Sequence, residues 1–271
     1  MQLLQQVEDV DAASAGTVRL EHHGVFATIV LNRPDKMNAI SCSVLAGIRR
    51  AIQAAEQTPS VKAIVIRGEG RAFSAGGDLE EVSALVADSR RFDEFLDYWH
   101  ESLNLVEDCE LPTIAAVHGI AFAGGFELTQ VCDFVVLGEQ TKIGDQHANL
   151  GLFPAGGSTQ RLTRLIGPRL AKWMLMTGST ISPHDALRVG LVNEVVEEDQ
   201  VLRRAEEMAS SFAAKSRRAS AEIKRALALG EGLPVRDALR YERQIAVRHM
   251  ASEDARVGIT AFQARTTPTF D

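Results

Sequence analysis

Cysteine is scarce in this sequence, and the three that occur are far apart. Cys42, Cys109 and Cys132 form no CxxC pair, and no cluster of metal-binding histidines lies near them. An odd number of separated cysteines argues against a disulfide framework and against structural zinc, and it is typical of a reduced intracellular protein. We therefore expect no metal site.

Motifs for nucleotide and metalloprotease chemistry are also missing. His100 and Glu101 are not followed by a second histidine at the HExxH spacing, no GxxxxGK[ST] run occurs, and no glycine-rich turn matches GxGxxG. The sequence therefore gives no support for a zinc protease, for nucleotide hydrolysis or for dinucleotide binding.

Positive charge and long apolar runs are lacking as well. With 36 acidic and 29 basic residues, the formal net charge is −7, which argues against nucleic acid or an anionic membrane as the main partner. No apolar run approaches the roughly 18 residues that a membrane-spanning helix needs. Residues 1–11 carry acids where a targeting peptide carries basic residues, so we expect a cytoplasmic protein with a mobile extension over residues 1–15.

Strand and helix patterns alternate through the first two-thirds of the chain, which predicts an α/β fold. Apolar or β-branched runs suited to buried strands occupy residues 25–31, 61–66 and 113–117. Helical spacing covers residues 44–56 and 85–108. After residue 196 only helical patterns follow, at residues 198–214, 217–229, 234–250 and 252–264.

An aromatic stripe lies on one face of the predicted helix 85–108. Phe92, Phe95, Trp99 and Leu103 recur at helical spacing. Packing in the core is the commoner fate of such a stripe, and contact with a ligand is the alternative.

Two glycine-rich turns, at residues 72–78 and 118–127, each follow a short β-branched run. Backbone NH groups from two such turns can point at one carbonyl oxygen. Preorganised donors of this kind stabilise the enolate oxyanion that forms when the carbon beside a thioester gains or loses a proton. Glu127 lies three residues after Gly124, on the same face of a plausible helix, and could transfer that proton. The alternative is that Glu127 only stabilises the helix dipole.

Several motifs in a fixed order give the chain a resemblance to the enoyl-CoA hydratase/isomerase (crotonase) superfamily. They are the two turns and residues 31–34, 37–39, 151–157 and 158–162, and the similarity extends from about residue 16 to residue 270. The resemblance implies a crotonase-like ββα spiral core with the acyl-CoA site in residues 16–197. It also implies a C-terminal helical region, residues 198–271, that forms homotrimers or dimers of trimers.

The resemblance also implies site residues. The NH groups of Gly77 and Gly124 would form an oxyanion hole, and Glu127 matches one of the two hydratase glutamates, whereas His147 stands at the position of the second. The substrate would be an acyl-CoA thioester, with no cofactor besides the coenzyme A that is part of it. Positions implied to bind this substrate are Lys36, Ala39, Ala75, Asp78, Leu79, Glu80, Phe262 and Arg265. Lys36 and Arg265 are the candidate cations for the CoA phosphates, Arg265 reaching the CoA of an adjacent subunit.

Because His147 stands where the second glutamate is expected, the sequence leaves open which reaction the protein catalyses. Glu127 and His147 could divide the proton transfers of water addition, or Glu127 could act with an ordered water. Alternatively, His147 only bonds within its loop while Asp145 caps a helical turn. We expect an enoyl-CoA hydratase-like lyase; the alternatives are a hydrolase or isomerase that uses His147 or Asp145, and a non-catalytic acyl-CoA-binding protein.

Overall fold

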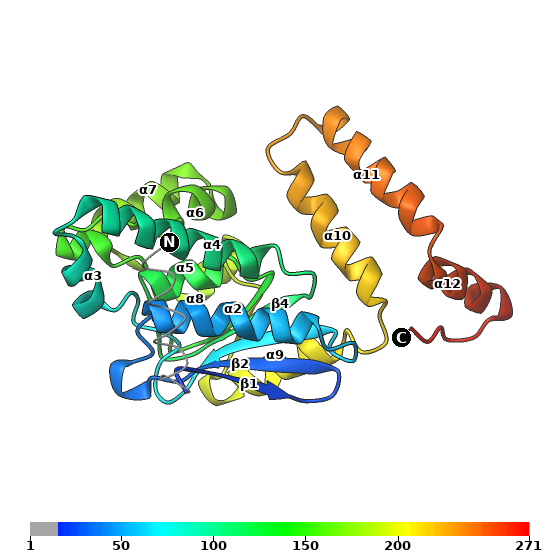
Figure 1. Cartoon of the computed structure of the whole chain (residues 1–271), viewed down its shortest axis with the longest axis horizontal. Helices are drawn as coiled ribbons and strands as arrows, with labels where there is room; N and C mark the ends of the chain where they lie inside the picture. The colour runs from blue at the N-terminus through cyan, green and yellow to red at the C-terminus, as the bar shows by residue number, and fades with distance from the viewer. Residues whose placement is uncertain (1–15, 271) are drawn as a thin grey trace.

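A six-stranded sheet forms the centre of the computed structural model, which describes residues 16–270 (Figure 1). Its strand order is β1-β2-β3-β4-β6-β9, with β1 antiparallel to β2 and every other pair parallel. The predicted extension over residues 1–15 lies outside the described residues. The strands are β1 (Val18–His22), β2 (Phe26–Leu31), β3 (Ala63–Gly68), β4 (Thr113–Val117), β6 (Phe134–Gly138) and β9 (Glu194–Val196).

A second, three-stranded sheet has the order β5-β7-β8. Its strands are β5 (Ile120–Phe122), β7 (Lys142–Gly144) and β8 (Thr180–Ile181). Strand β5 follows β4 and strand β7 follows β6 after short turns, so the chain passes repeatedly from the first sheet to the second. This repetition is the ββα spiral that the resemblance implies.

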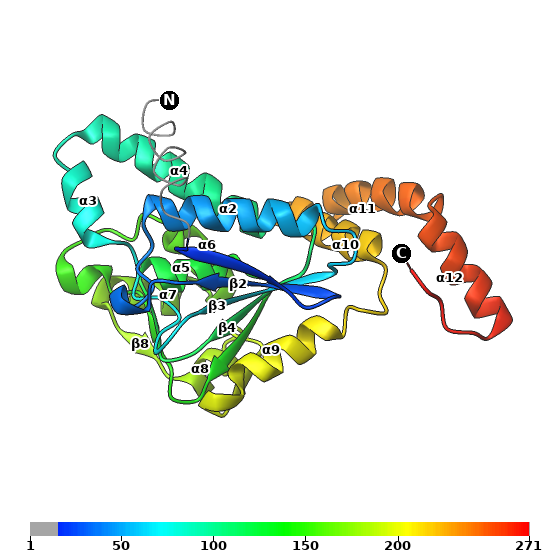
Figure 2. The ribbon, with the colours of Figure 1, turned by 60° about the horizontal axis from the view of Figure 1, so that its bottom comes forward.

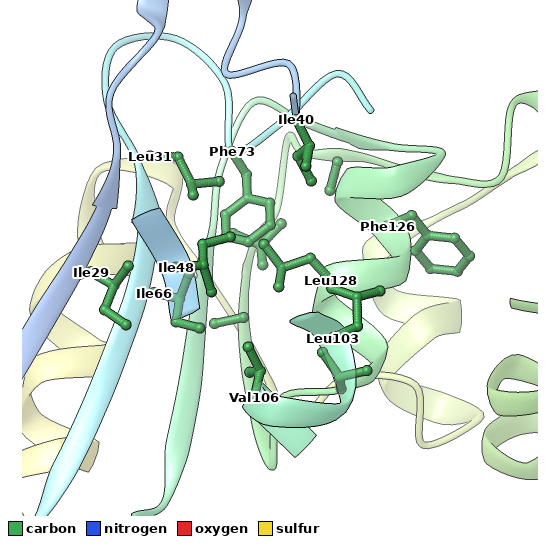
Figure 3. Packing of buried hydrophobic residues seen from close by; sticks show 14 of the residues in the cluster. Ile29, Leu31, Ile40, Ile48, Ile66, Phe73, Leu103, Val106, Phe126 and Leu128 are labelled. Carbon is green, nitrogen blue, oxygen red and sulfur yellow. The ribbon is translucent and has the colours of Figure 1, made fainter. Parts of the chain in front are cut away.

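Both faces of the central sheet are covered by helices, because its strands carry apolar side chains on both sides. In β3, Ile64 and Ile66 pack with α2 (Cys42–Glu56) and α4 (Ser89–Glu107). Val65 points to the other face, toward α9 (Val201–Ser210). Figure 2 shows α2 and α9 on opposite sides of the strands, and Figure 3 shows the packing between the sheet and α4.

The predicted helix 85–108 is α4, which begins only at Ser89, and residue 85 is the last residue of a separate helix, α3 (Leu79–Leu85), which the sequence analysis did not predict. The break occurs because Asp88 has an extended backbone, and its carboxylate accepts hydrogen bonds from the NH groups of Arg90 and Arg91. Asp78 caps α3 in the same way, through the NH of Glu80.

Four short helices and three 3₁₀ turns complete the body around the two sheets. The helices are α5 (Gly124–Gln130), α6 (Ser158–Ile166), α7 (Pro168–Thr177) and α8 (Pro183–Arg188), and the turns are η1 (Pro34–Lys36), η2 (His147–Leu150) and η3 (Glu198–Gln200). Every residue of α5 is buried, so this helix is fixed within the core.

Three C-terminal helices project from the body (Figure 1). They are α10 (Arg217–Gly230), α11 (Val235–Met250) and α12 (Glu253–Ala264), whose cap Ser252 accepts from the NH of Ala255 as its sequence predicts. Because α9 packs on the sheet, the projecting part begins with α10 and not at residue 198. Arg217, the first residue of α10, holds this end of the helix to the body by donating hydrogen bonds to the carbonyls of Thr58 and Val61. Within residues 16–270, none of the helices has the length and apolar composition to cross a membrane.

Candidate active site

The two glycine-rich turns meet beside the N-terminus of α5. Ser74 pairs with Ala121 and Ile40 pairs with Gly77 in isolated parallel bridges. Ile40 donates to the carbonyl of Gly76 at 2.7 Å and accepts from the NH of Asp78 at 2.8 Å, so the NH of Gly77 between them points away from Ile40. The NH of Gly77 bonds no acceptor among the described residues.

Gly124 supplies the second free NH group. It is the first residue of α5, so its NH has no acceptor within the helix. A β-carbon built on Gly124 would lie 3.2 Å from the nitrogen of Gly77 and 2.7 Å from the ring of Trp99. The two free NH groups therefore lie close together, in a space that only glycine leaves open.

A cavity of about 440 Å³ opens beside these NH groups. One wall is apolar and comes from α3, α4 and the loop after η2, whereas Glu127, Gln146 and His147 form a polar end. The main apolar lining residues are Leu79, Val82, Val86, Phe92, Phe95, Leu96, Trp99, Leu150, Leu152 and Phe153. Such a cavity suits a ligand with an apolar body and one polar group.

Glu127 projects from the first turn of α5 and is only 2% exposed. Its Oε1 accepts from the NH of Ser158 at 3.3 Å. Burial raises the pKa of Glu127 above its usual range, and the nearby positive charge of His147 opposes that rise. A buried carboxyl group whose pKa is raised in a cavity is a candidate for proton transfer.

His147 is held by Asp145. The Nδ1 of His147 lies 2.9 Å from Oδ1 of Asp145, which also accepts from the backbone NH of His147 at 3.1 Å. Burial alone lowers the pKa of His147, but the bond to Asp145 and the charges of Asp145 and Glu127 outweigh it and raise the pKa above its usual value. With Nδ1 occupied, Nε2 is the ring nitrogen left for a ligand.

The cavity brings together six of the predicted site residues. Gly77, Gly124, Glu127 and His147 all line it, as do Ala75 and Leu79. Of the residues that the structure describes, no three His, Cys, Asp or Glu side chains form a group that could hold a metal ion.

Four other predicted residues surround the first turn without lining the cavity. Arg33 connects two of them, donating to the carbonyl of Ala39 and forming an ion pair with Asp78 at 2.8 Å. Lys36 pairs with Glu80 at 2.9 Å, so its charge is already partnered in this structure.

Phe262 and Arg265 lie on the projecting helices. Phe262 is 84% exposed on α12, and Arg265 ends that helix. Neither lines the cavity of its own chain, from which α12 is far removed in both views (Figures 1 and 2). Substrate binding by both residues, with Arg265 reaching the CoA of an adjacent subunit, remains a prediction.

The aromatic stripe of α4 fulfils both interpretations given to it, since Phe95 and Trp99 are buried in the core and also line the cavity. The loop before α6 is a site feature to which the sequence analysis gave no role. Gly156 and Ser158 lie against Glu127, since a β-carbon on Gly156 would overlap Oε2 of that residue. The sequence signals were the motifs at residues 151–157 and 158–162, which supported the family resemblance but were given no role in the site.

Comparisons with known proteins show the family and the fold of the chain. The profile of the family described as enoyl-CoA hydratase/isomerase matches residues 21–271. The chain is 35% identical to the crotonyl-CoA hydratase of Syntrophomonas wolfei, and the match covers 90% of this chain and 93% of that protein. It is also 35% identical to the 2,3-dehydroadipyl-CoA hydratase of Escherichia coli, with 89% of this chain and 93% of that protein covered. The crystal structure of an enoyl-CoA hydratase from Polaromonas sp. JS666 matches with a TM-score of 0.89 at 30% identity, covering 94% of this chain and 99% of that one.

The chain therefore belongs to the enoyl-CoA hydratase/isomerase family and is a hydratase-like enzyme. The predicted fold class, a crotonase-like α/β core followed by C-terminal helices, is confirmed.

Proposed function

We propose that this enzyme adds water to 2-enoyl-CoA thioesters, or removes it from 3-hydroxyacyl-CoA thioesters, without a cofactor besides the CoA of the substrate. The observation that carries the proposal is the meeting of two free NH groups, those of Gly77 and Gly124, with the buried carboxyl of Glu127 in one apolar cavity. Hydration needs these parts together, because the thioester must be polarised while water gives up a proton.

The NH groups of Gly77 and Gly124 act on the thioester oxygen. Both would donate a hydrogen bond to it, and these bonds strengthen as the oxygen becomes the enolate oxyanion. The β-carbon becomes electrophilic as a result. The acyl tail would lie along the apolar wall built by α3 and α4.

Glu127 and His147 divide the proton transfers. The carboxylate of Glu127 takes one proton from water as the water oxygen bonds to the β-carbon, and protonated Nε2 of His147 gives its proton to the α-carbon. The product has gained one hydroxyl and one hydrogen, and the thioester stays intact. A proton then returns from Glu127 to His147 through solvent, which restores the starting pair.

Thioester hydrolysis is the second candidate, and the His147–Asp145 hydrogen bond favours it. A histidine oriented by a carboxylate is an arrangement that activates water in acyl-transfer enzymes. A direct attack by Asp145 is disfavoured, because this side chain is fully buried and does not line the cavity.

The test is to incubate purified protein with trans-2-enoyl-CoAs of increasing chain length and to resolve the products by mass. Water added to an intact thioester, with turnover lowered by about 10²- to 10⁴-fold in Glu127→Gln, supports the hydratase. Free CoA thiol in place of the hydrated thioester supports the hydrolase. Binding without turnover across the panel supports a non-catalytic acyl-CoA-binding protein.

The C-terminal helices suit assembly with further copies of this chain, as homotrimers or dimers of trimers. Large apolar side chains stand exposed along α10, α11 and α12, among them Ile223, Leu227, Val235, Val247, Met250 and Phe262. Exposed apolar faces of this size need a partner. Light scattering of the full chain gives the assembly size, and a monomer at micromolar concentration would contradict this part of the proposal.

A further inference from the structure

The peptide group between Gly76 and Gly77 sets the direction of the free NH of Gly77. This peptide is trans, so its N–H points away from its own C=O. The carbonyl of Gly76 accepts a hydrogen bond from the NH of Ile40 at 2.7 Å. That bond therefore holds the opposite end of the peptide, the NH of Gly77, toward the cavity that Gly77 lines.

A second peptide group, between Ala39 and Ile40, lies behind the first. Its N–H is the donor to Gly76, and its C=O, at the opposite end, accepts from Nη1 of Arg33 at 2.7 Å. Two peptide groups thus connect the guanidinium of Arg33 with the NH of Gly77 in series. Ile40 and Gly76 are both buried, so water competes little for the bond between them.

Further bonds fix Arg33 at the start of this series. Its Nη2 forms an ion pair with Oδ2 of Asp78 at 2.8 Å, and only 17% of its side chain is exposed. Its backbone NH donates to Oδ1 of Asn38 at 2.9 Å. Asn38 is buried with a φ of +55°, a conformation uncommon for residues other than glycine, and its Nδ2 donates to two backbone carbonyls. The guanidinium therefore keeps its place on the carbonyl of Ala39.

Hydrogen bonds in series polarise one another. A cationic donor on a peptide C=O draws electron density toward that oxygen and makes the N–H of the same peptide a stronger donor, and the effect passes to the next peptide. Each bond gains about 10–30% in this way. Since the cation stands at one end and the NH of Gly77 at the other, the polarisation has the sign that stabilises negative charge on the thioester oxygen. Asp78 offsets the charge of Arg33 at longer range, so the effect acts through the bonds.

We propose that Arg33 is a positioning residue of the oxyanion hole: through the peptides Ala39–Ile40 and Gly76–Gly77 it orients the NH of Gly77 and strengthens its bond to the thioester oxygen. The proposal rests on the hydration chemistry given above. Arg33 does not line the cavity and acts only through Gly77. Segments 31–34, 37–39 and 72–78, which are separate in the sequence, thereby serve one NH group.

The stretching frequency of the bound carbonyl measures this effect directly. A saturated acyl-CoA labelled with ¹³C at the thioester carbon cannot be hydrated, and its carbonyl can be observed by isotope-edited infrared spectroscopy. Binding to wild type should lower the frequency relative to water, because donors at the oxygen weaken the C=O bond. Arg33→Met keeps a long side chain but donates no hydrogen bond, so the frequency should return part of the way toward its value in water. An equal frequency in the two enzymes would overturn the proposal.

Steady-state kinetics give the second readout. In Arg33→Met we expect kcat for enoyl-CoA hydration to fall about tenfold, less than the roughly 10²- to 10³-fold cost of losing a whole oxyanion donor. KM should stay within about threefold, because the bond gains most of its strength in the transition state. Arg33→Lys keeps a cationic donor without the fork, so its kcat and carbonyl frequency should lie between those of wild type and Arg33→Met. If Arg33→Met does not fold, wild-type values of both readouts in Arg33→Lys would overturn the proposal.

Arg204→Met is the matched control. Arg204 of α9 loses an ion pair with Glu194 of β9, at 2.6 and 2.7 Å, and neither residue lines the cavity. This variant should keep the wild-type kcat and carbonyl frequency even if its melting temperature falls. Changes equal to those of Arg33→Met would show that the loss of any ion pair has this effect, and would overturn the role of Arg33.

Failure of this proposal differs from failure of the proposed function. If wild type hydrates enoyl-CoA and the Arg33 variants match it in both readouts, only the role of Arg33 is lost. If wild type hydrates none of the enoyl-CoAs, the proposed function is overturned, while the carbonyl frequency of the saturated acyl-CoA still tests Arg33.

Discussion

One carboxylate oxygen of Asp145 fixes both the ring and the backbone of His147. Oδ1 lies 2.9 Å from Nδ1 of the imidazole and 3.1 Å from the backbone nitrogen of the same residue. Asp145 is fully buried, whereas the side chain of His147 is 16% exposed. The pair therefore presents one ring nitrogen, Nε2, toward the cavity and stabilises the charged form of the ring.

Asp145→Asn should move the alkaline limb of the kcat/KM profile to lower pH. Burial lowers the pKa of His147, and the hydrogen bond and charge of Asp145 more than reverse this, so their loss lowers the pKa. In the proposed mechanism His147 must be protonated, and activity is lost as pH rises through its pKa. We expect kcat/KM at pH 8 to fall at least about tenfold, while activity at pH 6 changes less.

The control for this experiment is Asp185→Asn, which removes a surface carboxylate from α8. Its pH profile should match that of wild type. If Asp145→Asn instead lowers activity equally at every pH, Asp145 does not act through the protonation of His147.

Glu127→Gln should raise the melting temperature at pH 8 while it lowers turnover by about 10²- to 10⁴-fold. Burial is the main cause of the raised pKa of Glu127, which means that the folded state disfavours the carboxylate. The penalty is absent below the unfolded-state pKa, where both states are protonated, and it grows as pH rises toward the folded-state pKa. Glutamine carries no charge, so Glu127→Gln avoids this penalty. For a chain of this size, each kcal/mol regained corresponds to about 2–4 °C.

Thermal unfolding of wild type and Glu127→Gln at pH 5 and pH 8 tests whether the variant has the higher melting temperature. The gain of Glu127→Gln over wild type should be larger at pH 8. An equal gain at both pH values, or a loss at pH 8, would show that the ionised carboxyl does not strain the fold.

Local signals predicted the regular elements of this fold well. The run 113–117 is strand β4 with the predicted bounds, because a strand buried on both faces is a continuous apolar run. The expected helix 217–229 is likewise α10, within one residue. The break between α3 and α4 was missed, because it depends on one aspartate cap, Asp88, inside a pattern that otherwise continues.

The candidate site could be predicted only in part. The glycines and Glu127 lie in short motifs, and the resemblance that these motifs carry implied that they meet in one site. The contacts expected of Asp145 and His147 within their loop are present, since Asp145 bonds the first NH of η2 as well as the ring. The catalytic role of His147 stays a prediction. The position of the Trp99 indole depends on packing between α4 and two distant loops, which helical spacing does not encode.

Gly124→Ala should disable the enzyme while the chain still folds. The new β-carbon would lie 2.7 Å from the ring of Trp99 and 3.2 Å from the nitrogen of Gly77, where the thioester oxygen is proposed to bind. We expect kcat/KM to fall about 10²- to 10³-fold, with a loss of about 1–3 kcal/mol in unfolding free energy from overpacking. Steady-state kinetics and urea unfolding measure the two effects.

Gly230→Ala is the matched control, since its β-carbon would make an ordinary contact of 3.4 Å with Ala238 at the end of α10. This variant should keep wild-type kinetics. Full activity in Gly124→Ala would exclude the space between the two glycines as the site of the thioester oxygen.

A carboxylate at the end of the acyl chain should make a poor substrate. Glu127 and His147 are the only ionisable residues among the described lining of the cavity, and the wall proposed to hold the acyl tail is apolar, so that wall offers no cation to pair with such a group. Leaving a charge unpaired in an apolar site is costly. We expect kcat/KM for 2,3-dehydroadipyl-CoA to be at least about tenfold below that for trans-2-hexenoyl-CoA, which has the same chain length. Val82→Arg places a cation on the wall, so it should reduce the difference in kcat/KM between the two substrates. A wild-type enzyme that prefers the dicarboxylic substrate would mean that the acyl tail binds outside this cavity.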